Sequence, residues 1–279
     1  MAQTRLIPQE FEARFAKKLA EIDKLADTVR GILETMPVDE HRELRDANLV
    51  RAARNSLGQE GIEIKPEEAV EQFVNCYVPG LPPETRKAIE GHFAADYLVQ
   101  RWAERGKALT EDMILDTHTV LMSRTDPDYA GRYRQTRAIR PELPEGFRFP
   151  EPGDVPASVK GFLSRMETSD DHPLMRAVFT QLAVYRIHAF KDGNSRTSRL
   201  VQNMLLLRDG YLPVTVPEGL YVQHRKHLNA ALTQGWEHKD GLFSFMLDLE
   251  RQALTDFVRQ HGPKQEGPVK DVNEADYAR

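Results

Sequence analysis

Two apolar stretches with helical periodicity flank the sequence His188-Ala-Phe190-Lys-Asp192-Gly193-Asn194-Ser195-Arg196-Thr-Ser-Arg199. The first stretch repeats apolar residues every three or four positions, at Leu174, Val178, Leu182 and Tyr185, and the second has Leu200, Val201, Met204, Leu205 and Leu207. Gly193 permits backbone angles that a side chain would forbid, and Asn194 and Ser195 are good caps for the second helix. The pattern therefore predicts a polar loop held between two buried helices.

Helical periodicity dominates the rest of the chain as well. We expect helices over residues 7–36, 39–55, 66–78, 83–105, 110 onward, 155–167, 173–187, 195–208, 221–234 and 240–260. Four regions follow from this pattern: an N-terminal helical extension (1–45), a second helical region (46–108), a core (109–260) and a charged tail (261–279). The tail is poor in apolar residues and is expected to be disordered.

One segment departs from the helical pattern. Residues 131–152 contain Gly131, Pro141, Pro144, Gly146, Pro150 and Pro152, and two short candidate strands, Tyr133–Ile139 and Phe147–Phe149, flank a turn. We expect a β-hairpin here. The predicted fold class is mostly α: a helical bundle with a small β-hairpin.

Composition excludes several classes of protein. The net charge of −5 argues against non-specific binding to nucleic acid, and no uncharged apolar run approaches the roughly 20 residues needed to span a bilayer. The first nine residues contain no apolar signal-peptide core. A single cysteine, Cys76, excludes an internal disulfide and a cysteine-rich zinc site. We expect a cytoplasmic protein with neither a membrane nor a nucleic acid as partner.

The polar residues of the central loop together suit a polyphosphate and a metal ion. Free N–H groups and the positive dipole end at a helix N-terminus favour anions, and Arg196 and Arg199 share one face of that first turn. Asp192 offers a hard oxygen ligand for Mg²⁺, and His188 could act as a general base near neutral pH. Each residue alone has an ordinary structural explanation, but their joint order within twelve residues favours a functional site.

These residues closely resemble the signature of the Fic (filamentation induced by cAMP) family, H-x-F-x-[D/E]-G-N-[G/K]-R-x-x-R. Further matches lie outside it: Gly131-Arg132-Tyr133-Arg134 resembles the start of the family's flap hairpin, and His172-Pro173 its usual helix start. The resemblance spans roughly residues 45–255 and makes residues 109–260 a Fic core. Two positions depart from the signature, since Ala189 stands where proline is common and Ser195 where glycine or lysine is usual.

The resemblance implies a protein adenylyltransferase, which moves AMP from ATP to a Ser, Thr or Tyr hydroxyl of a target protein. By this resemblance His188 is the catalytic base and Asp192 holds Mg²⁺. The nucleotide phosphates would be bound by Gly193, Asn194, Ser195, Arg196 and Arg199. An unidentified target protein would dock on the flap, Arg225 and His227-Leu228-Asn229 would line the adenine side, and homodimerisation is left open.

A second pattern lies upstream, where Ser56-Leu-Gly-Gln-Glu60-Gly61 matches the inhibitory pattern [S/T]-x-x-x-E-[G/N]. Its place before the core resembles the class of Fic proteins with an N-terminal inhibitory helix in the same chain. There the glutamate pairs with the second arginine of the signature, here Arg199, and blocks the γ-phosphate. The resemblance thus implies self-inhibition by Glu60 and Ser56. Gly58 is unusual inside a helix, and an ordinary capped turn is the structural alternative.

Other functions stay open beside this one. A Fic-type transferase could move UMP, phosphocholine or a phosphoryl group, and the same machinery could remove AMP if Glu60 activates water. A catalytically silent nucleotide-binding module is the alternative from another class. His188 argues against it, because a protein that only binds nucleotide needs no base there.

Overall fold

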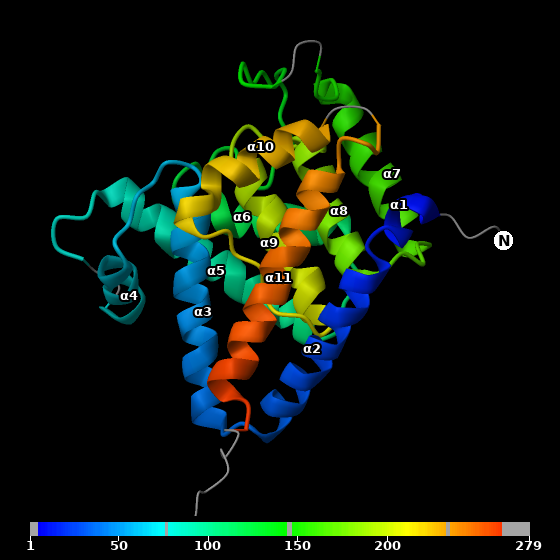
Figure 1. Cartoon of the computed structure of the whole chain (residues 1–279). Helices are drawn as coiled ribbons and strands as arrows, with labels where there is room; N and C mark the ends of the chain where they lie inside the picture. Colours follow the sequence, from blue (N-terminus) through cyan, green and yellow to red (C-terminus); the bar gives the residue numbers. More distant parts are fainter. Residues whose placement is uncertain (1–4, 76–77, 144–146, 233–234, 264–279) are drawn as a thin grey trace, which may run out of the picture.

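The computed structural model describes residues 5–75, 78–143, 147–232 and 235–263 (Figure 1). Its helices are α1 (Gln9–Ala13), α2 (Ala16–Thr35), α3 (Val38–Gly58), α4 (Pro66–Asn75), α5 (Pro83–Glu104), α6 (Glu111–Met122), α7 (Val155–Glu167), α8 (Pro173–Ile187), α9 (Asn194–Arg208), α10 (Tyr221–Leu232) and α11 (Asp240–His261), with short 3₁₀ turns at Pro152–Asp154 and Glu218–Leu220. None of the described helices is long and apolar enough to cross a membrane. Cys76 and residues 264–279 of the predicted tail lie outside the described residues.

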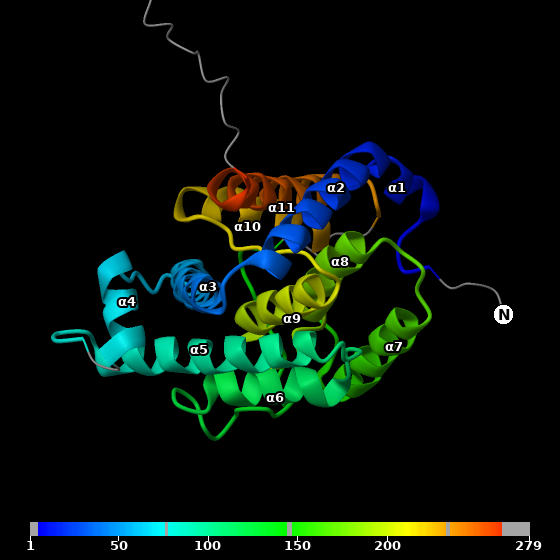
Figure 2. The same ribbon diagram turned by 90° about the horizontal axis from the view of Figure 1, so that it is seen from below.

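Helix α9 occupies the centre of the molecule. Figure 2 shows it beside α8, with α5 and α6 on one side, and nearly all of its residues are buried. Leu200, Met204 and Leu205 share one apolar cluster with Leu174, Val178 and Leu182 of α8, as the periodicity predicts. A helix surrounded on all sides cannot shift without disturbing close-packed neighbours, so the loop at its N-terminus is rigidly placed.

The N-terminal helices pack along α11, far away in the sequence (Figure 1). Phe11 of α1 is buried, and its ring centroid lies 4.9 Å from that of Trp236 and 5.1 Å from that of Phe243. Aromatic rings of this size contribute much of the energy of a core. The N-terminal residues are therefore an integral part of the fold.

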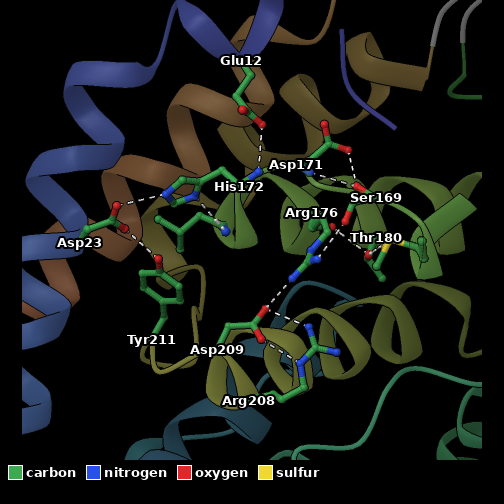
Figure 3. A network of polar contacts seen from close by, with 12 residues as sticks. Glu12, Asp23, Ser169, Asp171, His172, Arg176, Thr180, Arg208, Asp209 and Tyr211 are labelled. Atoms are coloured by element: carbon green, nitrogen blue, oxygen red, sulfur yellow. Dashed lines mark hydrogen bonds and ion pairs between the residues drawn. The ribbon is translucent and has the colours of Figure 1, made fainter. Parts of the chain in front are cut away.

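A polar network joins the N-terminal segment, residues 5–23, to the start of α8 (Figure 3). The Asp171 carboxylate is fully buried; it accepts hydrogen bonds from the backbone N–H of Leu6 (2.8 Å) and from Nε of Arg5 (3.0 Å). His172 donates its backbone N–H to Glu12 (3.0 Å), and its Nε2 lies 3.1 Å from an oxygen of Asp23. These bonds fix the N-terminal arm against the helix that carries His188 at its other end.

Replacing Asp171 by alanine is expected to lower the free energy of unfolding by about 2–4 kcal/mol, because the buried Leu6 N–H and the Arg5 guanidinium both lose a charged acceptor. Urea unfolding followed by circular dichroism measures the change. Asp170→Ala is the matched control: its half-exposed carboxylate lies 3.7 Å from Arg5, and we expect a change below about 0.5 kcal/mol. Equal losses in the two variants would contradict this role of Asp171.

The prediction of a β-hairpin flap is wrong. Residues 131–143 and 147–152 contain no strand, and none occurs elsewhere in the described chain; the turn residues 144–146 lie outside it. The physical reason is Arg134, whose buried guanidinium donates to the carbonyls of Thr136 (2.9 Å), Pro150 (2.5 Å) and His188 (2.7 Å). One side chain thus replaces the ladder of backbone hydrogen bonds that a hairpin would need, and the prolines remove donors from that ladder.

Candidate active site

The loop of the signature begins with an unusual backbone conformation. His188 follows the last residue of α8 with a φ of 49°, and among the described residues it is the one non-glycine residue in the left-handed region. Its carbonyl accepts the hydrogen bond from Arg134, and the carbonyl of Ala189 accepts one from the Arg134 backbone N–H (2.9 Å). Strain of this kind persists where surrounding contacts impose it, and it is typical of functional sites.

The His188 side chain is held as a neutral base. Its ring is buried between Phe149 (centroids 4.2 Å apart) and Tyr185 (5.6 Å), and Nδ1 lies 3.3 Å from the carbonyl oxygen of Tyr185. A carbonyl only accepts, so in this contact Nδ1 carries the proton and Nε2 keeps its lone pair. The pKa of His188 is lowered to about 4, chiefly by burial; the charges of Arg140 and Arg134 act in the same direction, whereas the Tyr185 carbonyl and Asp192 oppose the shift. The imidazole can therefore accept a proton at neutral pH.

Asn194 closes the loop and does not project into the site. Its Oδ1 accepts from the backbone N–H of Phe190 (2.9 Å) and its Nδ2 donates to the Phe190 carbonyl (2.8 Å). Phe190 is buried, as the sequence predicts, and its ring stacks on His118 at 3.7 Å. Only backbone atoms of Asn194 remain for a ligand, because both ends of its amide are used.

His118 supports the loop from α6, a role that the sequence did not reveal. Its Nδ1 accepts the backbone N–H of Gly131 (2.9 Å), so its Nε2 carries the proton and donates to the carbonyl of Asp192 (2.9 Å). Gly193 (φ 74°) packs against the same ring; a Cβ there would lie 3.2 Å from His118 and 2.9 Å from the sulfur of Met122. Glycine is required at this position both by its backbone angle and by the lack of space.

Asp192 and Arg196 lie at the solvent-facing end of the loop. The Asp192 carboxylate is two-thirds exposed; one oxygen accepts from the backbone N–H of Gly193 (2.6 Å) and the other lies 2.9 Å from the nearly buried guanidinium of Arg196. Among the described residues no three His, Cys, Asp or Glu side chains converge on a point. A single exposed carboxylate beside an anion site fits a Mg²⁺ ion that takes its remaining ligands from phosphate and water.

The two distant sequence patterns meet at Arg199. Its Nε donates to the Ser56 hydroxyl (3.0 Å), Nη2 donates to the Ser56 carbonyl and to the Glu60 carboxylate (both 2.8 Å), and Nη1 donates to the Ser195 hydroxyl (2.5 Å). Burial opposes ionisation of Glu60, but the charge and hydrogen bond of Arg199, with smaller effects of Arg196 and Ser195, hold the pKa of Glu60 below its ordinary value. Glu60 is therefore ionised at neutral pH and occupies this arginine.

Helix α10 holds the end of α3 in this position. Arg225 donates to the carbonyl of Gln59 (2.6 Å), and Arg54 pairs with Glu218 just before α10 (2.6 Å). A Cβ on Gly58 would lie 2.7 Å from the hydroxyl oxygen of Tyr221. The glycine inside α3 thus has a reason: it lets α10 approach the turn that carries Glu60.

A cavity of about 200 Å³ lies between α3, α8, α9, α10 and the segment after Arg134. Glu60, Ser195 and Arg199 line it, whereas His188, Asp192 and Arg196 are not among its lining residues. Ser195, Arg199, Arg225 and Asn229 are among the predicted residues that reach it, whereas His227 packs against Phe245 instead. The sequence did not reveal the further lining residues Arg140, Glu142, Tyr185, Tyr221 and His224. A groove of about 750 Å³ between α7, α8 and α10 is larger but contains no residue of the signature, so the smaller cavity is the candidate nucleotide site.

The site thus combines a buried neutral histidine with a helix N-terminus and two arginines, groups that suit phosphate binding and transfer chemistry. Residues 108–206 match the model of the Fic/DOC family. This stretch of the chain is therefore similar to a Fic/DOC domain.

Two curated relatives, both named Protein adenylyltransferase Fic, share about 30% of residues with this chain. The protein from Drosophila grimshawi is 30% identical over 164 residues, covering 53% of this chain and 33% of its own length. The one from Culex quinquefasciatus is 31% identical over 136 residues, covering 47% and 25%. The chain therefore spans about a third or less of the length of these relatives.

Solved structures of Fic proteins share the fold. A Fic-domain signalling protein from Bacteroides thetaiotaomicron superposes with a TM-score of 0.77 at 16% identity, over 86% of this chain and 96% of that one. Fic-1 from C. elegans gives 0.74 at 20% identity, over 88% and 72%. A Fic family protein from Desulfovibrio desulfuricans gives 0.71 at 23%, over 95% and 79%. The likeness extends well beyond residues 108–206, since it covers 86–95% of this chain.

Proposed function

We propose that this protein is a protein adenylyltransferase, which moves AMP from ATP to a Ser, Thr or Tyr hydroxyl of a target protein and is inhibited by its own Glu60. The observation that carries the proposal is a neutral His188 packed against Tyr185, which lines an arginine-rich cavity, within a stretch that matches a Fic domain. The names of the curated relatives support the same activity.

The base has a defined task in this reaction. The target hydroxyl oxygen attacks the α-phosphorus while Nε2 of His188 takes its proton. A bond forms between the hydroxyl oxygen and the α-phosphorus, the bond from that phosphorus to the bridging oxygen breaks, and diphosphate leaves with the electron pair. The contact of Nδ1 with the Tyr185 carbonyl orients the ring, so that the free lone pair belongs to Nε2.

The leaving diphosphate needs positive charge around it. Arg196 would supply that charge, together with Arg199 once it is released from Glu60 and with backbone N–H groups of the first turn of α9. Asp192 would hold Mg²⁺, which when bound screens phosphate charge and helps to position it. Asn194 holds the loop through Phe190, and Gly193 keeps its turn in the left-handed region.

The Glu60–Arg199 pair accounts for the inhibition. Arg199 cannot bind the terminal phosphate of ATP while it donates to Glu60, and the carboxylate places negative charge where that phosphate would lie. Ser56 holds the same guanidinium through its hydroxyl and its carbonyl.

Target docking, metal use and location are further parts of the proposal. The target would bind beside residues 138–143 and 147–150, without strand pairing, since these residues form no strand. Mg²⁺ dependence, a cytoplasmic location and the division into the regions given above stay predictions.

Intact-mass spectrometry after incubation with ATP and Mg²⁺ tests the proposal. Because wild type is expected to be inhibited, the Glu60→Gly variant is used, with His188→Ala in the same background as the blank. A His188-dependent adduct of the mass of AMP is expected. An adduct of another nucleotide or of phosphocholine, seen only with that donor, would contradict the choice of ATP, and no adduct with any donor would favour a silent binding module.

A further inference from the structure

The segment that follows Arg134 brings a third arginine to the cavity. Arg140 and Glu142 both line it, and the two residues pair with each other, with Nε of Arg140 3.1 Å from Oε1 of Glu142. Nη2 of Arg140 donates to the hydroxyl of Tyr185 at 3.4 Å, and the Tyr185 ring packs against His188. Arg140 thus lies near the base, although it belongs to a different segment from every residue of the signature.

The three arginines that line the cavity differ in how firmly they are held. Arg199 donates to four oxygen atoms and is nearly buried, and Arg225 is bound to the carbonyl of Gln59. Arg140 and Glu142 both keep about two-fifths or more of their side chains exposed, and an exposed pair of this kind contributes little to stability. Arg140 can therefore exchange its carboxylate partner for a ligand at small cost.

The structure of the segment does not depend on Arg140. Arg134 binds the carbonyls that fix the chain before and after it, and neither Glu142 nor Tyr185 needs Arg140 to stay in place, since one is exposed and the other is packed in the core. The guanidinium at position 140 lies close enough to affect both Glu60 and His188 electrostatically. Through the hydroxyl of Tyr185 it connects the lining of the cavity with the residue that packs against the base.

We propose that Arg140 is a further substrate-binding residue, which leaves Glu142 and donates to phosphate oxygens of the bound nucleotide. The proposal rests on the proposed function. A planar guanidinium can bind two phosphate oxygens at once, and charge on these oxygens rises while the bond to diphosphate breaks. Glu142 acts as the counter-ion of Arg140 in the empty site and competes with the nucleotide for it.

Substitutions of Arg140 and Glu142 are expected to have opposite effects on the use of ATP, measured in the Glu60→Gly background. Arg140→Ala is expected to lower kcat/KM for ATP by about 10–100-fold, and Arg140→Lys by less, because the charge remains without the bidentate geometry. Glu142→Gln is expected to raise the affinity for ATP by about 2–5-fold, because Arg140 then has no ion pair to break before it binds the nucleotide; the gain is small because an exposed ion pair is weak. Arg137→Ala is the matched control: this arginine belongs to the same segment, pairs with Glu151, does not line the cavity, and should change nothing.

A pH profile separates substrate binding from a merely structural role. The charged groups that act on His188 are Arg140 and Arg134, which lower its pKa, and Asp192, which raises it, as does the carbonyl of Tyr185. Removing Arg140 removes one lowering influence, so the acid limb of kcat/KM should move to higher pH in Arg140→Ala and stay in place in Arg137→Ala. A structural defect would lower the rate without moving this limb.

A measurement of ATP binding, which needs no AMP transfer, tests the role of Arg140 independently of the proposed function. If the Glu60→Gly parent transfers no AMP, the proposed function fails, and calorimetric titration of ATP into the Arg140→Ala and Arg137→Ala variants still tests Arg140. Weaker binding by Arg140→Ala alone supports the proposal. Equal affinities in the two variants, or equal kcat/KM values and pH profiles, overturn it.

Discussion

Replacing Glu60 by glycine is expected to raise the rate of AMP transfer by about 10–100-fold and to tighten ATP binding. The substitution releases Nη2 of Arg199 and removes a carboxylate from the place of the terminal phosphate. Like charges a few ångströms apart in a partly buried site repel strongly, and a nucleotide displaced by about 1 Å can lose about 10²-fold in rate. Labelled ATP measures transfer, and calorimetry measures binding.

The variant should stay folded, because Arg199 keeps its hydrogen bonds to Ser56 and to the Ser195 hydroxyl. Glu60 itself lies beyond the C-cap of α3, so glycine there does not interrupt the helix. Circular dichroism of the purified variant checks this point before any rate is compared.

Three further variants isolate the cause. Glu60→Gln keeps the size of the side chain without its charge and should recover much of the gain. Glu63→Gly, an exposed acid on the same turn, should have no effect. Arg199→Ala should lose activity, since it removes a phosphate ligand together with the inhibitory contact. If Glu60→Gly labels no better than wild type, residues 56–61 are an ordinary turn.

Local sequence was sufficient to predict the helices that carry the site. The bounds of α7 and α8 agree with the periodicity and with prolines at the first turns, and α9 begins at Asn194 directly after the left-handed Gly193. These signals lie within a few residues of the feature they determine, which is why a single sequence reveals them.

The features that sequence reasoning missed depend on contacts between distant segments. The hairpin prediction was wrong because Arg134 binds carbonyls up to 54 positions away, and nothing in its neighbourhood of the sequence indicates those partners. His118, which shares its hydrogen bonds between Gly131 and Asp192, reads as a core histidine on an apolar helix face. Arg140 is one arginine in a proline-rich segment, and only the fold brings it to the cavity.

Replacing His188 by alanine is expected to lower the rate of AMP transfer by about 10²–10⁴-fold and to leave ATP affinity within a factor of about three, measured in the Glu60→Gly background. In the proposed mechanism the histidine acts on the incoming hydroxyl, whereas the arginines and the α9 N-terminus bind phosphate. Single-turnover labelling gives the rate, and calorimetric titration gives the affinity. His227→Ala, a histidine outside the cavity, is the control and should change neither.

The pH dependence of transfer tests the same assignment without a mutation of the base. The pKa of His188 is lowered to about 4, so the base is free above that pH and transfer should be lost only as pH falls towards 4, well below the ordinary histidine value of about 6.5. The sign follows from burial, which disfavours the protonated ring. Nucleotide binding adds negative charge near the ring and should raise the apparent pKa in kcat above that in kcat/KM for ATP, which reports the enzyme without nucleotide. An alanine variant that transfers AMP at the parent rate, with the same acid limb, would show that another group takes the proton.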